Sequence, residues 1–233
     1  TRERKGRMAE ALFPRIIEGR PRRVFAVGDI HGCIDEVRVL INFLTNEQAL
    51  DERDQLIFIG DYIDRGRGSR QVIELMIALK NMQKRLVRYV ANGGGAFFDS
   101  YGIDYTDSLS EIREQIPATH IDFLLGLELG VVLGEFMFVH AGIDPLKSIK
   151  EQRPQDILWI RGEFLENPHN LGKTVVFGHT SFNDVLIDLP YRIGIDTGAI
   201  YGNQLSIVEL VHGDLYQVSV GESAVRTSRL VPS

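Results

Sequence analysis

The sequence predicts an α/β fold in which two β-sheets form a sandwich core flanked by helices. Short apolar runs recur along the chain, each followed by polar residues, and helical patterns lie between the first three of these runs. From residue 191 onward, alternating strand patterns follow one another without helices, which indicates a second set of strands. The two patterns together favour two sheets covered by helices.

The composition limits the size and the class of the protein. A chain of 233 residues with 44% hydrophobic residues can bury one core, so we expect a single domain over residues 1–233. The net charge of −6 argues against a nucleic-acid partner, because binding to phosphate backbones depends on clustered Lys and Arg. Cys33 is the only cysteine, and no apolar run reaches the roughly 18 residues of a membrane span. We therefore expect a cytoplasmic protein without a membrane partner.

The individual elements follow from the local patterns. Helical periodicity covers Ile34 to Leu44 and, after Ser69 as the expected N-cap, Gln71 to Met82. A less regular stretch at 96–135 is expected to be an insertion containing a helix near 108–126. The alternation from Tyr191 to Val220 predicts strands joined by a turn at 213–215. Five apolar runs are expected to be buried strands: 24–29, 55–61, 86–92, 136–142 and 174–180.

Polar residues of metal-binding types follow all five strand candidates. Ligands in layered α/β proteins collect outside the carboxyl ends of strands. Imidazole nitrogens together with carboxylate oxygens suit borderline divalent metals such as Mn, Fe, Zn or Co. This recurrence predicts a metal site, whereas the isolated His120, His169 and His212 are expected to be surface or satisfied core residues. The site candidates are Asp29, His31, Asp61, Asp64, Asn92, His140 and His179.

Two short motifs in this set are specific in their order and spacing. Gly28 to Gly32 reads GDIHG, and Gly60 to Gly66 reads GDYIDRG. With these motifs the chain resembles the metallophosphoesterases of the serine/threonine protein phosphatase superfamily, which include bacterial protein phosphatases and diadenosine tetraphosphate hydrolases. The resemblance runs from about residue 24 to 210 and implies the calcineurin-like metallophosphoesterase fold. Later matching segments are VHAG at 139–142, LWIRGEF at 158–164, VFGHT at 176–180 and IDTGAIYGNQL at 195–205.

The resemblance also implies a dinuclear metal site that hydrolyses phosphate esters by direct attack of metal-activated water. Manganese is the first choice for both ions, with Fe, Zn or Co as alternatives. In this reading Asp29 and His31 hold one ion, and Asp61 bridges it to the second. The remaining ligands of the second ion are Asn92, His140 and His179.

The same resemblance assigns phosphate-binding roles to two arginines. Arg65 and Arg161 would bind the phosphate oxygens with their planar guanidinium groups, which can donate two parallel hydrogen bonds as Lys cannot. The alternative for Arg161 is an ordinary surface salt bridge. Trp159, the only tryptophan, is expected to pack beneath the loop of Arg161 rather than to touch substrate.

The sequence departs from the family at its third motif. The family has GNHE or GNHD there, and its histidine is the general acid, whereas residues 91–95 read ANGGG. Asn92 keeps the ligand, but Gly93 cannot donate a proton, and Asp64, which would orient the histidine, loses its partner. Losing a positioned acid costs roughly 10²- to 10⁴-fold in rate.

Several interpretations of this departure stand side by side. In the first interpretation Gly93 is an engineered change. In the second the protein is a natural variant that acts on substrates whose leaving groups depart unprotonated. In the third it binds metal and phosphate without efficient turnover. A shifted register would bring Asp99 toward the site instead. The leading prediction is hydrolysis of phosphate monoesters, as in phosphoprotein serine/threonine phosphatases, and the alternative is hydrolysis of dinucleoside polyphosphates. The expected partner is a phosphorylated protein, a small phosphate ester or a nucleotide polyphosphate.

Overall fold

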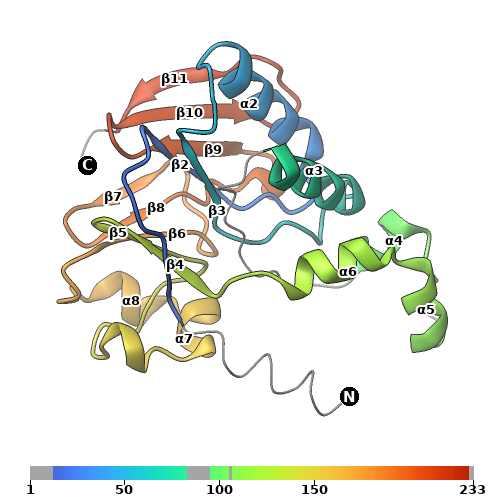
Figure 1. Ribbon diagram of the computed structural model, residues 1–233, viewed down its shortest axis with the longest axis horizontal. Coiled ribbons are helices and arrows are strands. Elements are labelled where there is room, and N and C mark those ends of the chain that lie inside the picture. The colour runs from blue at the N-terminus through green and yellow to red at the C-terminus, as the bar shows by residue number, and fades with distance from the viewer. Residues whose placement is uncertain (1–12, 83–94, 105–106, 231–233) are drawn as a thin grey trace.

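A computed structural model describes residues 13–82, 95–104 and 107–230, and within these ranges the predicted α/β sandwich is confirmed (Figure 1). Two mixed sheets stack on each other with helices outside them. In spatial order, the first sheet contains β1 (Arg15–Ile16), β4 (Gly130–Leu133), β5 (Phe136–Val139), β6 (Thr174–Phe177), β8 (Arg192–Gly194) and β7 (Leu186–Asp188). The second contains β11 (Arg226–Arg229), β10 (Asp214–Ser219), β9 (Gln204–Glu209), β2 (Val24–Val27) and β3 (Gln55–Phe58).

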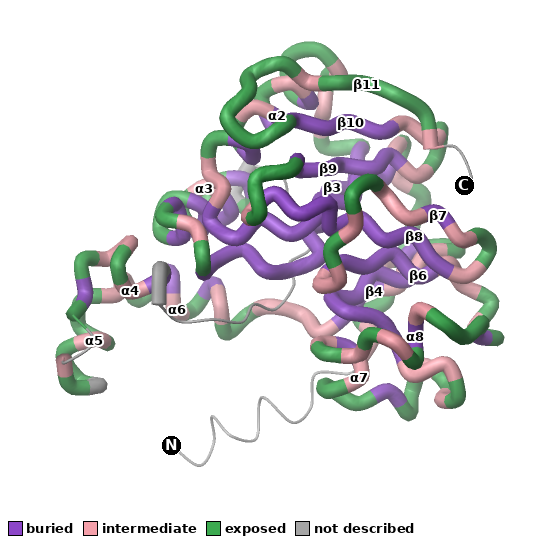
Figure 2. The backbone as a smooth tube through the Cα atoms, turned by 180° about the vertical axis from the view of Figure 1, so that it is seen from behind, coloured by how far each residue is buried: buried purple, intermediate pink, exposed green. Residues whose placement is uncertain are grey.

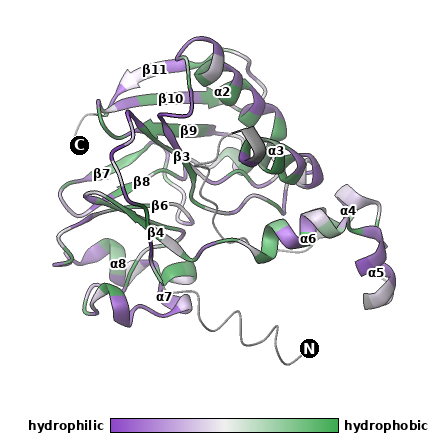
Figure 3. Cartoon of the chain, in the orientation of Figure 1, coloured by the Kyte–Doolittle hydropathy of each residue, from purple (hydrophilic) through white to green (hydrophobic). Residues whose placement is uncertain are grey.

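The central strands are buried on both faces, as Figure 2 shows in purple. In β2, Val24 and Ala26 belong to a hydrophobic cluster that contains residues of both sheets, whereas Phe25 and Val27 belong to a cluster shared with the helices. Successive side chains of a strand point to opposite faces, so one face packs against the other sheet and the next against the helices. This explains why the strands read as continuous apolar runs rather than as polar and apolar alternation. Figure 3 shows the contrast between the hydrophobic β9 and the hydrophilic edge strand β11.

Helices cover the outside of this core. The longest are α2 (Ile34–Asn46) and α3 (Ser69–Met82), and α2 contacts β9 and β10. Three short helices extend to one side of the sandwich in Figure 1: α4 (Gly95–Tyr101), α5 (Leu109–Gln115) and α6 (Ala118–Leu125). Near the first sheet lie η1 (Ile149–Glu151), α7 (Pro154–Trp159) and α8 (Gly162–Glu166), and η2 (Ala199–Tyr201) precedes β9. No helix in the described ranges combines the length and the apolar character that crossing a membrane requires.

Several expected elements differ in detail. The helix expected near 108–126 is two helices, because Pro117 interrupts the pattern between α5 and α6. The stretch 96–135 also contains β4, which pairs with β5 and therefore belongs to the main sheet. The strand expected at 86–92 lies outside the described residues. Leu210 to Gly213 form the turn between β9 and β10, so Asp214 and Leu215, which were assigned to this turn, already lie in β10.

Ser69 has a different role from the predicted N-cap. Helix α3 begins at Ser69 itself, and this side chain is fully buried. Its hydroxyl accepts a hydrogen bond from the Asp64 backbone N–H at 3.0 Å and donates one to the Gly66 carbonyl at 3.1 Å. Ser69 therefore fixes the loop that contains Asp61 and Asp64 against the start of the helix.

Candidate metal centre

The candidate ligands lie at the carboxyl ends of four strands. Asp29 and His31 follow β2 and Asp61 follows β3, and these two strands are parallel neighbours in one sheet. His140 follows β5 and His179 follows β6, which are parallel neighbours in the other sheet. Parallel strands end at the same edge of a sheet, so each pair of strands delivers its polar residues to one edge. Stacking of the two sheets then brings the two edges together.

Five of the predicted ligands form two groups that share one residue. Asp29, His31 and Asp61 form the first group, and Asp61, His140 and His179 form the second. In each group the candidate ligand atoms lie within 4.8 Å of one another. The two oxygens of Asp61 face different imidazoles, with Oδ2 at 2.9 Å from Nε2 of His31 and Oδ1 at 3.5 Å from Nε2 of His140. Asp61 thus stands between two potential ion positions.

A backbone contact sets the direction of the His31 ring. Its Nδ1 lies 3.2 Å from the carbonyl oxygen of Ile63, which can only accept a hydrogen bond. In the neutral ring Nδ1 therefore carries the proton, and Nε2 presents its lone pair toward Asp61. Two ligand atoms 2.9 Å apart can coordinate one ion that lies beside both, so the donor set suits a divalent metal.

Other buried polar atoms of the same residues have no protein partner. Among the described residues, no hydrogen bond satisfies Asp29 Oδ1, Asp61 Oδ1, Nε2 of His140 or Nε2 of His179. Buried polar atoms in native proteins are otherwise nearly always satisfied. The concentration of such atoms in one place is the pattern expected for ligands of metal ions.

The electrostatic environment keeps the imidazoles of His140 and His179 uncharged. Burial lowers the pKa of His140, and burial together with the nearby His140 and Arg161 lowers the pKa of His179 to about 4. Both rings are therefore neutral at pH 7, which is the form that binds metals. Burial, with the charges of Asp196 and Asp61, raises the pKa of Asp29 well above its usual range. A cation at the site would relieve that penalty on the charged carboxylate.

Glycines leave the space into which these ligands fit. A Cβ atom at Gly60 would overlap Nδ1 of His140, and one at Gly178 would overlap Oδ1 of Asp29. The Asp29 carboxylate is also held from the other sheet, because its Oδ2 accepts a hydrogen bond from the His179 backbone N–H at 2.9 Å. The glycines that precede Asp61 and His179 are therefore needed for close approach.

The backbone of the site is strained. Six non-glycine residues of the described chain have positive φ, and all except Ala49 belong to the candidate site. Such conformations are costly for residues with a Cβ and collect at functional sites, where surrounding structure holds them in place. The five are His31, Asp61, Asp64, Arg65 and His179.

Asp64 is buried and lacks a partner. Neither of its carboxylate oxygens makes a hydrogen bond with any described residue. Burial and the charge of Asp61 raise its pKa to about 6. The prediction that replacement of the family histidine by Gly93 leaves Asp64 alone stays a prediction, because Asn92 and Gly93 lie outside the described residues. Asp99, the candidate in a shifted register, is exposed on α4 and belongs to neither metal group.

The two predicted arginines lie beside the metal groups. Arg65 Nη1 is 3.2 Å from Nε2 of His31 and donates a hydrogen bond to the Tyr201 hydroxyl at 2.8 Å. Arg161 Nη1 donates to the carbonyl of His179 and to Oγ1 of Thr180, both at 3.1 Å. Arg161 has no ion pair with any described residue, which disagrees with the surface salt bridge considered as its alternative role.

Sequence reasoning missed two aromatic residues at this site. Tyr201 lies in the matched segment 195–205, but no sequence pattern indicates that its hydroxyl meets Arg65. Trp159 was expected to pack beneath its loop, and this was wrong: it is 53% exposed and its ring stands perpendicular to that of His179, with centroids 5.8 Å apart. The contact between the rings of Trp159 and His179 joins residues that are distant in sequence, so no local pattern predicts it.

The three histidines that were assigned no role make ordinary structural contacts. Nδ1 of His120 lies 2.6 Å from the Tyr101 hydroxyl, and Nε2 of His169 lies 2.8 Å from the Tyr191 carbonyl. His212 lies 3.0 Å from Glu209. None of the three belongs to a metal group among the described residues.

Comparison with known proteins agrees with this geometry. The family model of the calcineurin-like phosphoesterases matches residues 22–199. A bis(5'-nucleosyl)-tetraphosphatase PrpE of Oceanobacillus iheyensis is 27% identical over 79% of this chain and 87% of its own. Serine/threonine-protein phosphatase 1 of Salmonella typhimurium is 26% identical over 86% of this chain and 98% of its own. The structure of a cold-active protein tyrosine phosphatase has a TM-score of 0.64 and 16% identity, and covers 93% of this chain and 81% of its own.

Proposed function

Because the chain belongs to the calcineurin-like phosphoesterase family, we propose that it hydrolyses phosphate esters at a centre of two divalent metal ions. The observation that supports this most directly is the pair of buried Asp and His groups that share Asp61. We assign Asp29 and His31 to one ion, His140 and His179 to the other, and Asp61 to both. We also assign Asn92 to the second ion, and this assignment rests on the sequence alone because Asn92 lies outside the described residues.

The arginines give the centre its affinity for phosphate. When bound, the metal ions would polarise the phosphoryl oxygens and lower the pKa of an attacking water toward neutrality. Arg65 and Arg161 approach from separate segments and can each donate to non-bridging phosphate oxygens. Tyr201 fixes the guanidinium of Arg65, and the carbonyl of His179 fixes that of Arg161. The phosphate is thereby oriented before reaction.

We place phosphate monoesters first as substrates, as in the phosphoprotein serine/threonine phosphatases. A serine/threonine-protein phosphatase of Salmonella among the relatives supports this class. The metal assignment is manganese, because the mixed oxygen and nitrogen donors suit it, with Fe, Zn or Co as alternatives. Since Gly93 offers no acid, the enzyme should prefer monoesters with acidic leaving groups, such as aryl phosphates, over phosphoserine.

The test is release of phosphate with Mn²⁺ from 4-nitrophenyl phosphate and from a phosphoserine peptide. We expect turnover of the aryl ester, and a rate in the Asp61→Asn variant at least about 100-fold lower, since Asp61 belongs to both metal groups. Equal rates for the wild type and this variant would show that the proposed centre does not catalyse the reaction.

A second candidate function is hydrolysis of dinucleoside polyphosphates. The bis(5'-nucleosyl)-tetraphosphatases among the relatives favour it. Its leaving group is a nucleotide, which departs without a positioned acid, and this agrees with Gly93. Parallel measurements of kcat/KM on diadenosine tetraphosphate and on the aryl ester decide the order of the two candidates.

A third candidate is a protein that binds metal and phosphate with little turnover. Restoring the acid distinguishes it from an active enzyme: Gly93→His should raise the rate on phosphoserine by roughly 10²- to 10⁴-fold if Asp64 can orient the new imidazole. The matched control is the double variant Gly93→His with Asp64→Ala, in which most of that gain should be lost. No gain in the single variant would mean that residue 93 is not the position of the acid.

A further inference from the structure

A cavity of about 490 Å³ is lined in part by Trp159, whose ring contacts that of the proposed ligand His179. Its walls come from the loop at 144–146 and from α7 and α8. The apolar part includes Leu146, which is 94% exposed, and Trp159, which is 53% exposed. Exposed large apolar side chains that gather around one cavity are typical of a binding site.

Trp159 forms a wall between this cavity and the metal centre. Its ring contacts that of His179, and Arg161, two residues later, donates to the His179 carbonyl. The backbone also joins the two places, because the Ala141 N–H, next to His140, donates to the Ile157 carbonyl of α7 at 2.8 Å. A molecule with its phosphate at Arg161 can therefore place its next group against the indole of Trp159.

The charges of the cavity exclude the phosphate itself. Asp144, Asp156 and Glu163 line it, and the ammonium of Lys147 pairs with the first two at 2.8 and 2.7 Å. One lysine against three carboxylates leaves a weak negative excess, which repels an anion. Since two of the three carboxylates are already paired with Lys147, the cavity also attracts a strongly basic peptide only weakly. An uncharged group suits it best.

The polar rim specifies the kind of uncharged group. The side-chain amides of Gln155 and Asn167 line the cavity, and each can both donate and accept hydrogen bonds. A half-exposed indole and two side-chain amides in the lining of one cavity match a heteroaromatic ring, which packs on aromatic side chains and forms hydrogen bonds along its edge. We propose that this cavity binds the base of a nucleotide whose phosphate lies at the metal centre. This inference rests on the proposed function and narrows its substrates to nucleotides.

The single tryptophan makes the cavity directly observable. Because Trp159 is the only tryptophan of the chain, its fluorescence reports on this wall alone. Adenosine, which has no phosphate, should quench that fluorescence in a saturable way, and ribose should not. A saturable response to adenosine supports the base site. No response to adenosine, or a response only to a lysine-rich peptide, would overturn it.

A variant with a matched control locates the binding. Leu146→Asp replaces an exposed apolar side chain of the cavity lining with a charged one, and the bound base would desolvate that charge, so the adenosine response should weaken at least about 5-fold. Val211→Asp makes the same change at an exposed residue in the turn between β9 and β10, and should bind adenosine as the wild type does. Equal weakening in both variants, or in neither, contradicts the assignment. Circular dichroism confirms that each variant is folded.

An activity measurement separates this inference from the proposed function. The ratio of kcat/KM for diadenosine tetraphosphate to that for 4-nitrophenyl phosphate should fall about 5-fold in Leu146→Asp, because only the first substrate carries a nucleobase and neither leaving group needs a positioned acid. An unchanged ratio in an active enzyme overturns the base site and leaves the phosphoesterase assignment intact. If the wild type binds adenosine but hydrolyses no phosphate compound with any metal, the proposed function fails while the base site stands.

Discussion

An alanine methyl group at position 178 would occupy the place of the Asp29 carboxylate. Gly178→Ala should therefore displace Asp29 and weaken metal binding in the group that Asp29 forms with His31 and Asp61. We expect fewer bound metal ions per chain by elemental analysis and a corresponding loss of phosphatase activity. The control is Gly102→Ala, where a methyl group meets no atom within 4 Å and the positive φ strains only a position outside the metal groups. If Gly178→Ala keeps the metal content of the control, Asp29 is not a ligand.

Tyr201 acts through Arg65 and is therefore a positioning residue. Tyr201→Phe removes the hydroxyl that accepts the hydrogen bond from Arg65. A single hydrogen bond to a charged group contributes about 1.5–3 kcal/mol, so kcat/KM for an aryl phosphate should fall roughly 10-fold or more.

A double-mutant cycle checks the route of this effect. In an Arg65→Ala background, Tyr201→Phe should have little further effect, because the group that it positions is gone. Full additivity of the two losses would show that Tyr201 acts independently of Arg65.

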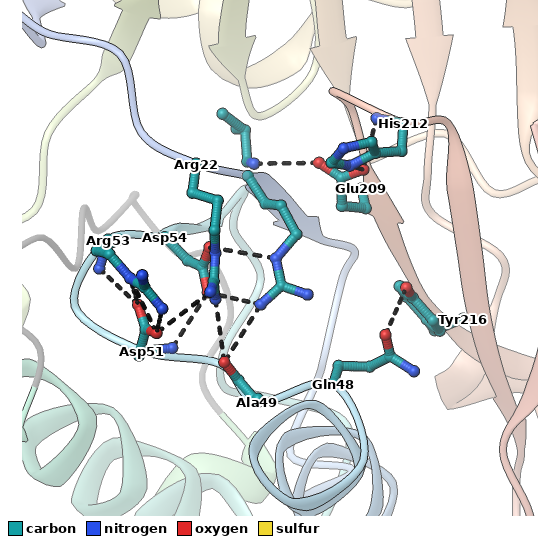
Figure 4. Close-up of polar contacts among 11 residues, drawn as sticks. Arg22, Gln48, Ala49, Asp51, Arg53, Asp54, Glu209, His212 and Tyr216 are labelled. Atoms are coloured by element: carbon teal, nitrogen blue, oxygen red, sulfur yellow. Dashed lines mark hydrogen bonds and ion pairs between the residues drawn. The ribbon is translucent and has the colours of Figure 1, made fainter.

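An ion-pair cluster joins the starts of β2 and β3 (Figure 4). Arg22 and Arg23 precede β2, Asp54 precedes β3, and the Asp54 carboxylate accepts hydrogen bonds from both arginines. These strands carry Asp29 and Asp61 at their other ends. The cluster therefore helps to fix the register on which the metal centre depends.

Asp54→Asn should lower the free energy of unfolding by about 2 kcal/mol at pH 7, because it removes hydrogen bonds between charged groups around a buried carboxylate. Urea denaturation provides the measurement. Glu74→Gln is the control: its partner Arg70 and Glu74 are each 47% exposed, and such helix pairs contribute only about 0.3–0.5 kcal/mol. Similar losses in both variants would contradict the importance of the cluster.

The same cluster predicts a pH dependence. Burial by itself raises the pKa of Asp54, but the hydrogen bonds from Arg22 and Arg23 outweigh it and lower the pKa to about 2. Because the folded-state pKa lies below the ordinary one, the contribution is complete above about pH 4 and is lost as the pH falls through about 2. The stability difference between the wild type and Asp54→Asn should therefore shrink over that interval, and a constant difference would argue against ionic stabilisation.

At the scale of the whole molecule, the metal centre lies where the two sheets meet. Asp29, His31 and Asp61 extend from one sheet, and His140 and His179 from the other. Bound ions would cross-link the sheets and stabilise the folded chain, since the unfolded chain has no assembled site.

Chelation should therefore destabilise the protein. At metal concentrations about a thousand times Kd, binding stabilises a protein by about 4 kcal/mol, which corresponds to roughly 10 °C in Tm for a chain of this size. Calorimetry with Mn²⁺ and with EDTA measures the difference. Asp61→Asn serves as the control and should melt at nearly the same temperature in both conditions. A wild type that responds no more than this variant would contradict a metal cross-link between the sheets.

The parts of the fold and site that the sequence predicted correctly depend on patterns within a few neighbouring residues. The strand runs and the residues that follow them could be read directly, and five of the six predicted ligands lie together in the described structure. The break at Pro117 and the inclusion of β4 in the main sheet were missed. Whether a short apolar run joins a sheet depends on the strand available to pair with it, and here that strand is β5.

The sequence by itself determined which chemical groups are present and that each follows a strand. That information lies within a few neighbouring residues, because strand patterns and turn residues are set by local geometry. Only the tertiary structure decided which of these groups meet. The bond between the His179 backbone and Asp29 joins residues 150 positions apart, and the bond between Arg65 and Tyr201 joins residues 136 apart. Contacts of that range arise from the stacking of two whole sheets, and for this reason the exposure of Trp159 and the cavity that it lines appear only in the folded molecule.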